Sequence, residues 1–283
     1  MFGETFTASI PDRPIVPAAG EGFYESLGLS FRGTLTTTVT LEAFLNLVFP
    51  LTFIANEPRV VMRGRDLFAL HTAWYNDSPG FNEGATGTTD TVLGIRVPLW
   101  VVPGTKENLS YNLTRVAVTN LSLEVVSLSA LFTTAPPPAL AGRGRLDMRE
   151  IPFTTPAATG PFQVTPRLPQ FGKLLGLLIF GNTVPTNAAT AATIQSLSVD
   201  IQNRTLFKGM WQDLQTAFQN NIDFTRADAT ALVKRQVLQN YGFIDFREEP
   251  VDLIANVVSV NVDAEVASDA GRIVPIIEIP QVP

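Results

Sequence analysis

Cysteine is absent from the 283-residue sequence, and His71 is its only histidine. Cysteine nucleophiles, disulfide scaffolds, iron–sulfur clusters and cysteine–histidine zinc sites are therefore excluded. A Ser-His-Asp triad would have to use His71. Because these absences remove the side chains on which most familiar hydrolases and metalloenzymes depend, the sequence favours a protein that is not an enzyme and holds no cofactor.

Positive charge is scarce. The sequence has 16 Arg and 4 Lys against 26 acidic residues, which gives a net charge of −6. The densest basic cluster consists of Arg143, Arg145 and Arg149. Binding to nucleic acid depends on neutralising phosphates, so a chain this acidic and without a basic patch is not expected to bind nucleic acid directly.

Long apolar runs are also missing. The longest, residues 44–55, is interrupted by Asn46, Pro50 and Thr52, and it is shorter than the ~20 residues that span a bilayer. The N-terminal segment contains Glu4 and has no apolar core, unlike a secretory signal peptide. These features predict synthesis in a reducing cytoplasm.

Apolar residues, by contrast, make up 45% of the chain and charged residues 16%, which is enough to form a substantial core. Apolar side chains alternate with polar or small ones in residues 27–31, 93–101, 121–125 and 260–266. A period of two is typical of antiparallel strands with one face in a core. Together with the length, this pattern predicts a mainly β protein of two domains.

Helical patterns are few and short. In residues 205–218, Met210, Leu214 and Phe218 recur every four residues and form one apolar stripe. Residues 225–241 have a similar stripe, and Gly242 follows as a plausible C-terminal stop. The sequence therefore predicts two short helices carried by loops on a β framework.

Prolines mark the predicted domain boundaries. Residues 1–20 contain Pro11, Pro14 and Pro17 and are expected to form an extended N-terminal arm. Eight of the 21 prolines lie in residues 133–169, which favours a connector over residues 136–168 because proline removes ladder donors. Residues 21–135 and 169–283 are then the two β domains.

The two halves contain an internal echo. Residues 60–68 are similar to residues 199–207 at an offset of 139. Each copy places a predicted strand before a Gly or Asn turn position and then an Arg-X-Leu-Phe string. A tryptophan follows in each, Trp74 or Trp211, in what we expect to be a short helix. The echo favours a duplicated domain.

These patterns resemble a known family. Two β-sandwich halves, a proline-rich connector and a Trp-bearing strand–turn–helix in each half are similar to double jelly-roll major capsid proteins. The lineage includes tailless icosahedral bacteriophages and adenovirus. The segment SLSVDIQNRTLFKGMWQDLQTAF, with the later YGFIDF, resembles the second half of the small corticovirus type. The resemblance implies two jelly rolls in tandem with a few loop-borne helices.

The resemblance also implies an assembly. Family members form homotrimers that act as pseudo-hexameric capsomers and tile an icosahedral virion. Neighbouring capsomers, penton or minor capsid proteins and an internal lipid membrane are the partners that it implies. The family has no catalytic, cofactor or metal residues to carry over. Residues 72–90, rich in Gly, Asp, Asn and Thr, are expected to form a long loop that faces outward or lies at an interface.

Several carboxylates are of the residue type that acid/base catalysis uses. Glu248 and Glu249 are adjacent, and adjacent residues of an extended chain point to opposite faces, so they do not form an acid/base pair. Asp200 and Asp213 flank the Trp-bearing segment, and no sequence feature brings them together. Each is expected to be a solvated charge or a cap.

Other candidates have ordinary structural interpretations. Asn82, Glu83 and Asp90 supply oxygen ligands that Ca²⁺ prefers, but their spacing matches no known loop. His71 lies in an apolar context and is expected to be a hydrogen-bonded structural residue. The three tryptophans suit cores and interfaces, or alternatively a sugar-binding platform: Trp74, Trp100 and Trp211.

Two alternatives to a capsid subunit stay open. The first is a double jelly-roll protein that binds or hydrolyses glycans, for which a secretion signal and an aromatic–carboxylate cluster would be expected. The second is a virion or surface-layer protein with single jelly rolls.

Overall fold

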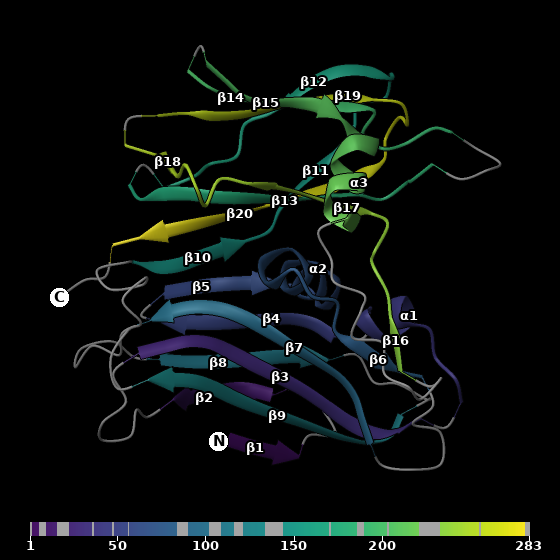
Figure 1. The fold of residues 1–283 in the computed structure, drawn as a ribbon, viewed down its shortest axis with the longest axis vertical. Coiled ribbons are helices and arrows are strands. Elements are labelled where there is room, and N and C mark those ends of the chain that lie inside the picture. The colour runs from purple at the N-terminus through teal and green to yellow at the C-terminus, as the bar shows by residue number, and fades with distance from the viewer. Residues whose placement is uncertain are drawn as a thin grey trace. The chain divides into compact units, whose positions relative to one another are not determined.

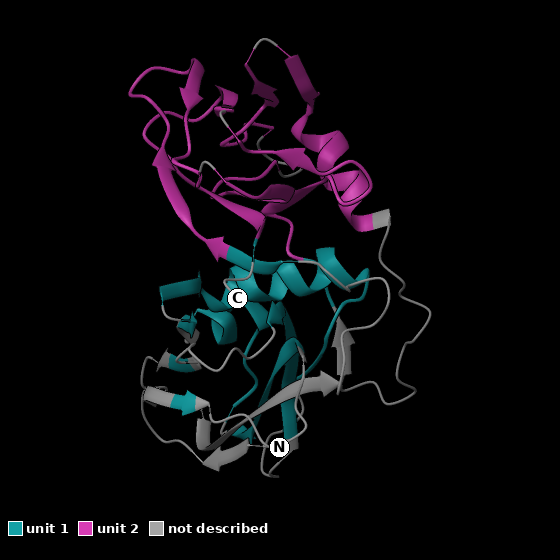
Figure 2. Cartoon of the chain, turned by 90° about the vertical axis from the view of Figure 1, so that its left-hand side faces the viewer, with its two compact units in different colours: residues 1–147, 222–237, 280–283 teal, residues 148–221, 238–279 magenta. Residues whose placement is uncertain are grey.

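The computed structural model describes most of the chain. The described residues are 2–5, 10–15, 23–35, 37–46, 48–55, 57–83, 90–101, 109–115, 121–133, 144–169, 171–185, 190–202, 204–220, 233–254 and 256–280. Two compact units are present (Figure 2). Unit 1 comprises Met1–Asp147, Ile222–Val237 and Pro280–Pro283, and unit 2 comprises Met148–Asn221 and Leu238–Ile279.

Unit 1 is built mainly of antiparallel strands (Figure 1). Its elements are β1 (Phe2–Thr5), β2 (Ile10–Ile15), β3 (Phe23–Leu35), α1 (Leu41–Leu45), β4 (Val48–Ala55), β5 (Glu57–Met62), α2 (Gly64–Tyr75), β6 (Gly80–Asn82), β7 (Asp90–Val101), β8 (Leu109–Arg115), β9 (Leu121–Thr133), β10 (Arg145–Arg149) and β16 (Val233–Arg235). One sheet has the order β1-β9-β3-β7-β6-β16, and β10-β5-β4-β8-β2 are neighbours in another.

The alternation in the sequence accounts for the long strands of unit 1. On β3, Leu27 and Leu29 are buried, and β7 pairs Val97 and Ile95 with them in antiparallel register. Helix α2 is buried on nearly every side, as expected for a helix without a polar face. Thr40 caps α1 by accepting a hydrogen bond from the Ala43 amide.

Unit 2 is a β-sandwich. Its elements are β11 (Ile151–Thr154), β12 (Gly160–Val164), β13 (Lys173–Gly181), β14 (Ser196–Ile201), β15 (Arg204–Met210), α3 (Trp211–Asn220), β17 (Tyr241–Asp245), β18 (Val251–Asp252), β19 (Val258–Ala264) and β20 (Ala270–Ile279). One sheet contains β17-β13-β20, with β11 paired to β20 and β18 paired to β13. The other has the order β12-β19-β14-β15.

The two sheets of unit 2 share one apolar core. Leu177 and Ile273 from one sheet pack with Val199 and Val260 from the other. Each buried side chain of this size contributes roughly 1.5–3 kcal/mol relative to exposure. The mainly β prediction and the strands expected around residues 27–31, 93–101, 121–125 and 260–266 are confirmed.

The proline-rich segments contain strands. Residues 2–5 and 10–15 of the expected arm form β1 and β2, which pair with β9 and β8. Both are edge strands, where proline is tolerated because one side of the strand needs no donors. The expected connector 136–168 contains β11, β12 and all of β10. The jelly-roll boundaries at 21–135 and 169–283 stay a prediction.

The helical predictions also need correction. The helix expected over 205–218 begins only at Trp211, because residues 204–210 form β15 and pair with β14. Of the helix expected over 225–241, residues 225–232 lie outside the described residues, and 233–235 are β16. Tertiary pairing overrides local propensity at such segments.

The internal echo joins segments with different structures. Arg65 to Phe68 lie in α2, whereas Arg204 to Phe207 lie in strand β15. The loop expected over 72–90 is likewise shorter, since α2 continues to Tyr75 and β6 follows, while residues 84–89 lie outside the described residues. The two copies of the echo therefore have similar sequences, but their backbones have different hydrogen-bond partners.

Candidate functional site

His71 is a structural residue of unit 1. It is 7% exposed on α2, and its Nδ1 accepts a 2.8 Å hydrogen bond from the Arg96 amide on β7. The ring contacts Tyr75, with 5.1 Å between the ring centroids. Burial lowers the pKa of His71 to about 4, and the charge of Asp77 opposes this shift. The prediction of a hydrogen-bonded structural histidine is confirmed.

Asp200 joins three strands of unit 2. Its carboxylate accepts hydrogen bonds from Thr205 Oγ1 at 2.5 Å, from Ser198 Oγ at 3.0 Å and from the Asn261 amide. The Thr205 hydrogen bond is the largest cause that holds the pKa of Asp200 below its ordinary value. Asp213 lies in the first turn of α3. Asp200 is therefore a cross-strand acceptor rather than one member of a catalytic pair.

A second, partly buried network fixes the start of β20. Asp269 accepts a 2.5 Å hydrogen bond from Thr193 Oγ1 and a 2.9 Å bond from the Asn182 amide. The Asp269 amide donates to Thr155 Oγ1 at 2.7 Å. Burial raises the pKa of Asp269, but the hydrogen bonds outweigh it, so the net pKa is below the ordinary value. This network holds the loop between β13 and β14 and was not foreseen from the sequence.

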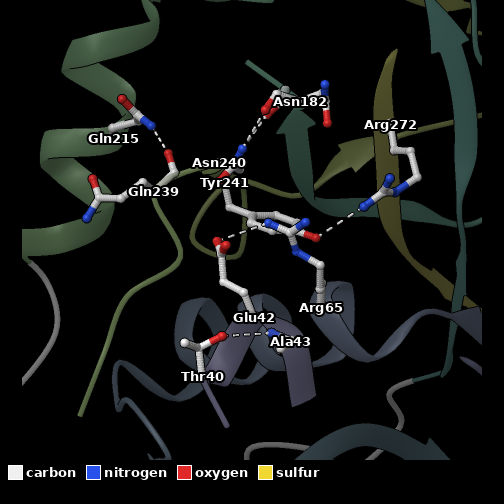
Figure 3. Close-up of polar contacts among 11 residues, drawn as sticks. Thr40, Glu42, Ala43, Arg65, Asn182, Gln215, Gln239, Asn240, Tyr241 and Arg272 are labelled. Atoms are coloured by element: carbon white, nitrogen blue, oxygen red, sulfur yellow. Dashed lines mark hydrogen bonds and ion pairs between the residues drawn. The ribbon is translucent and has the colours of Figure 1, made fainter. Parts of the chain in front are cut away.

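Buried arginines form further contacts that sequence reasoning missed. In unit 1, nitrogens of the Arg59 guanidinium lie 3.3 Å from a carboxylate oxygen of Asp147 and 3.3 Å from a carboxylate oxygen of Glu57. In unit 2, Arg272 donates to the Tyr241 hydroxyl at 3.3 Å (Figure 3) and lies 3.9 Å from the centroid of the Phe180 ring. The sequence feature that could have indicated these contacts is an arginine within a predicted strand, because a buried charge requires a partner.

The calcium candidates are only partly described. Asn82 is buried on β6, and Glu83 follows in a turn, whereas the side chain of Asp90 lies outside the described residues. Over the described ranges, no three His, Asp or Glu side chains are grouped so that they could hold a metal ion. Among those same ranges, no helix is long and apolar enough to cross a membrane.

The tryptophans pack within the fold. Trp74 contacts Trp100 edge-on, with 5.6 Å between ring centroids, and Trp211 is 1% exposed in the core of unit 2. Trp74 is also buried. Trp74 and Trp211 therefore belong to cores, as the structural interpretation of the sequence predicts, and Trp100 is half-buried against Trp74.

Glu248 and Glu249 line a hollow of about 670 Å³ in unit 2. Asp245 and Asp252 lie on the same rim, and Asp245 pairs with Arg247 at 2.6 Å. The hollow is open and partly apolar. Its lining, as far as the structure describes it, contains four carboxylates and no histidine.

Comparisons with known proteins identify the fold. No protein-family model matches the sequence, and no curated protein matches it significantly. The major capsid protein of Sulfolobus turreted icosahedral virus is 15% identical and covers 98% of this chain and 96% of its own, with a TM-score of 0.66. The major capsid protein of bacteriophage PM2 is 12% identical over 99% of this chain and 97% of its own, with a TM-score of 0.61.

A chain of the PBCV-1 virus capsid is also similar. It is 8% identical over 99% of this chain and 94% of its own, with a TM-score of 0.57. A structural similarity at such low sequence identity shows a shared fold and does not show a shared activity. The prediction of fold class is confirmed: this chain has the double jelly-roll fold that these capsid proteins have.

Proposed function

We propose that this protein is a structural subunit of an icosahedral virus shell. The observation that supports the proposal best is that capsid proteins match 98–99% of this chain and 96–97% of their own length. A likeness of this extent includes both units of the chain. The proposal places the protein in the virion.

Self-association is part of the proposed function. Three copies would form a capsomer with six jelly rolls, and neighbouring capsomers would tile the shell. Penton or minor capsid proteins and an internal lipid membrane are further proposed partners. The packed tryptophans and the hydrogen-bonded carboxylates favour a subunit that is not an enzyme.

Measuring the mass of the purified protein in solution tests this function. Size-exclusion chromatography with light scattering is expected to give a species near three times 30.7 kDa, or larger assemblies. Electron microscopy of those assemblies should show hexagonal or shell-like particles. A strict monomer at every concentration that also binds oligosaccharide would contradict the proposal and favour a glycan-binding jelly roll.

A further inference from the structure

The sandwich of unit 2 has an open edge between its two sheets. In the described part of the chain, β15 is the edge strand of one sheet and β17 is the edge strand of the other. Helix α3 packs on both strands and buries Trp211 and Leu214. Next to the opposite end of β15, residues 204–207, 244–246 and 248–252 line the hollow. The hollow is thus a place where the core is not covered by its own chain.

The lining of the hollow combines buried or half-buried apolar side chains with exposed acidic ones, which we call its rim: Asp245, Glu248, Glu249 and Asp252. Six apolar side chains line it: Ile201, Leu206, Phe207, Ile244, Phe246 and Val251. On the rim, Asp245 is neutralised by Arg247, while no ion pair engages Glu248 or Glu249 among the described residues. Arg204 is the basic residue of the lining. An occupant should therefore be apolar and carry positive charge.

Exposed apolar side chains lie close in sequence to the lining residues Asp252 and Asn256. Phe171, Ile254 and Val257 are 54%, 64% and 58% exposed. The loops that carry them are joined by a 3.0 Å hydrogen bond from the Leu253 amide to the Gly172 carbonyl. Three large exposed apolar groups beside an apolar hollow are typical of a protein–protein contact surface.

The chain also presents a surface that complements this one. Phe207 packs against the core of unit 2, whereas Lys208 and Met210 pair with Ser198 and Ser196 on β14, which alternate with buried Leu197 and Val199 and so lie on the outer face of the sheet. Lys208 and Met210 are exposed there, Met210 by 46%. No ion pair engages Lys208 among the described residues, although its charge lowers the pKa of nearby Asp200.

We propose that the hollow receives the outer face of β15 from a second copy of this chain. Lys208 of one copy meets the rim carboxylates of the next, and Met210 covers the exposed apolar group around Ile254. The complementary charges favour this occupant, and the same carboxylates repel an anionic lipid surface. Each copy offers both surfaces, so the contact continues from copy to copy. The inference rests on the proposed function and names one of its contacts.

A charge swap tests the pairing. Glu249→Lys and Lys208→Glu are each expected to weaken self-association roughly three- to tenfold, because each places like charges together. The double variant should restore it, since opposite charges then face each other again. Arg32→Glu is the matched control, because Arg32 is an exposed basic residue of unit 1, and it should have no effect. Sedimentation over a concentration series measures all four.

The outcomes separate this contact from the general function. If the original protein does not self-associate, the proposed function fails. If it does, and both single variants assemble like the control, the docking proposal is overturned while the function stands. Single variants that are both weakened without rescue in the double variant also overturn the pairing. Binding to phosphatidylglycerol vesicles that is lost in Ile254→Ser would assign the surface to lipid instead. Circular dichroism checks that each variant is folded.

Discussion

At the residue scale, the polar side chains within the strands are held by specific partners. Arg272 is 9% exposed, and its guanidinium contacts Tyr241, Phe180 and Glu150. A buried charge without such partners would be strongly destabilising. These contacts explain why charged residues occur in strands that are otherwise apolar.

His71 predicts a specific pH dependence of stability. Its pKa is about 4 in the folded protein and 6.5 as the ordinary value. Because the unfolded chain binds the proton more readily, stability is lost as the pH falls from 6.5 towards 4. The lowered pKa of His71 corresponds to a loss of about 3 kcal/mol in the free energy of unfolding once the pH is well below 4.

Urea unfolding at pH 7, 5.5 and 4.5 measures this loss. Other groups titrate in this range too, so His71→Gln is the reference: the fall in the free energy of unfolding should be smaller in the variant by about 1–3 kcal/mol. Equal slopes in the two proteins would show that His71 is not the group responsible.

At the element scale, the packing of α3 on β17 depends on a glycine. A Cβ at Gly242 would lie 2.8 Å from Leu214 Cγ and 3.3 Å from a ring carbon of Trp211. Both neighbours are buried, so neither can move freely. The sequence suggested Gly242 as a helix stop, whereas its role in the structure is close approach between a helix and a strand.

Gly242→Ala is expected to destabilise the protein by about 1–3 kcal/mol through overpacking. Gly94→Ala is the matched control, because Gly94 also lies in a strand and has no atom within 4 Å of an added Cβ. Its effect should stay within about 0.5 kcal/mol. Thermal unfolding of both variants checks this, and an equal effect in the two would contradict the packing argument.

The networks of Asp200 and Asp269 illustrate why elements were harder to predict than fold class. Each carboxylate joins residues that are far apart in sequence: Thr193 and Asp269 are 76 positions apart, and Asp200 and Asn261 are 61 positions apart. A single sequence contains no signal for such pairs. Whether Arg-X-Leu-Phe becomes a helix or a strand likewise depends on its partner, which is β14 for residues 204–207.

At the scale of the whole molecule, the N-terminal residues belong to the fold. β1 lies at the edge of one sheet of unit 1, and β2 lies at the edge of another. Removing residues 1–17 would therefore expose the backbone groups of β9 and β8.

That deletion should leave a folded protein of lower stability. The loss is expected to be on the order of 2 kcal/mol, which lowers the thermal midpoint by roughly 4–8 °C. Deleting residues 1–5 alone removes only β1 and should cause a smaller change. An unchanged midpoint in both deletions would mean that these strands contribute nothing to stability.

The sequence alone determined the absence of thiol chemistry, the acidic charge, the mainly β class and the strands that alternate with a period of two. These properties are local or compositional, so they survive without knowledge of contacts. Tertiary structure decided that the proline-rich segments contain strands, that residues 204–207 are not helical, and that Glu248 and Glu249 stand on the rim of a hollow. Those outcomes depend on hydrogen bonds and packing between residues distant in sequence, which no local pattern contains.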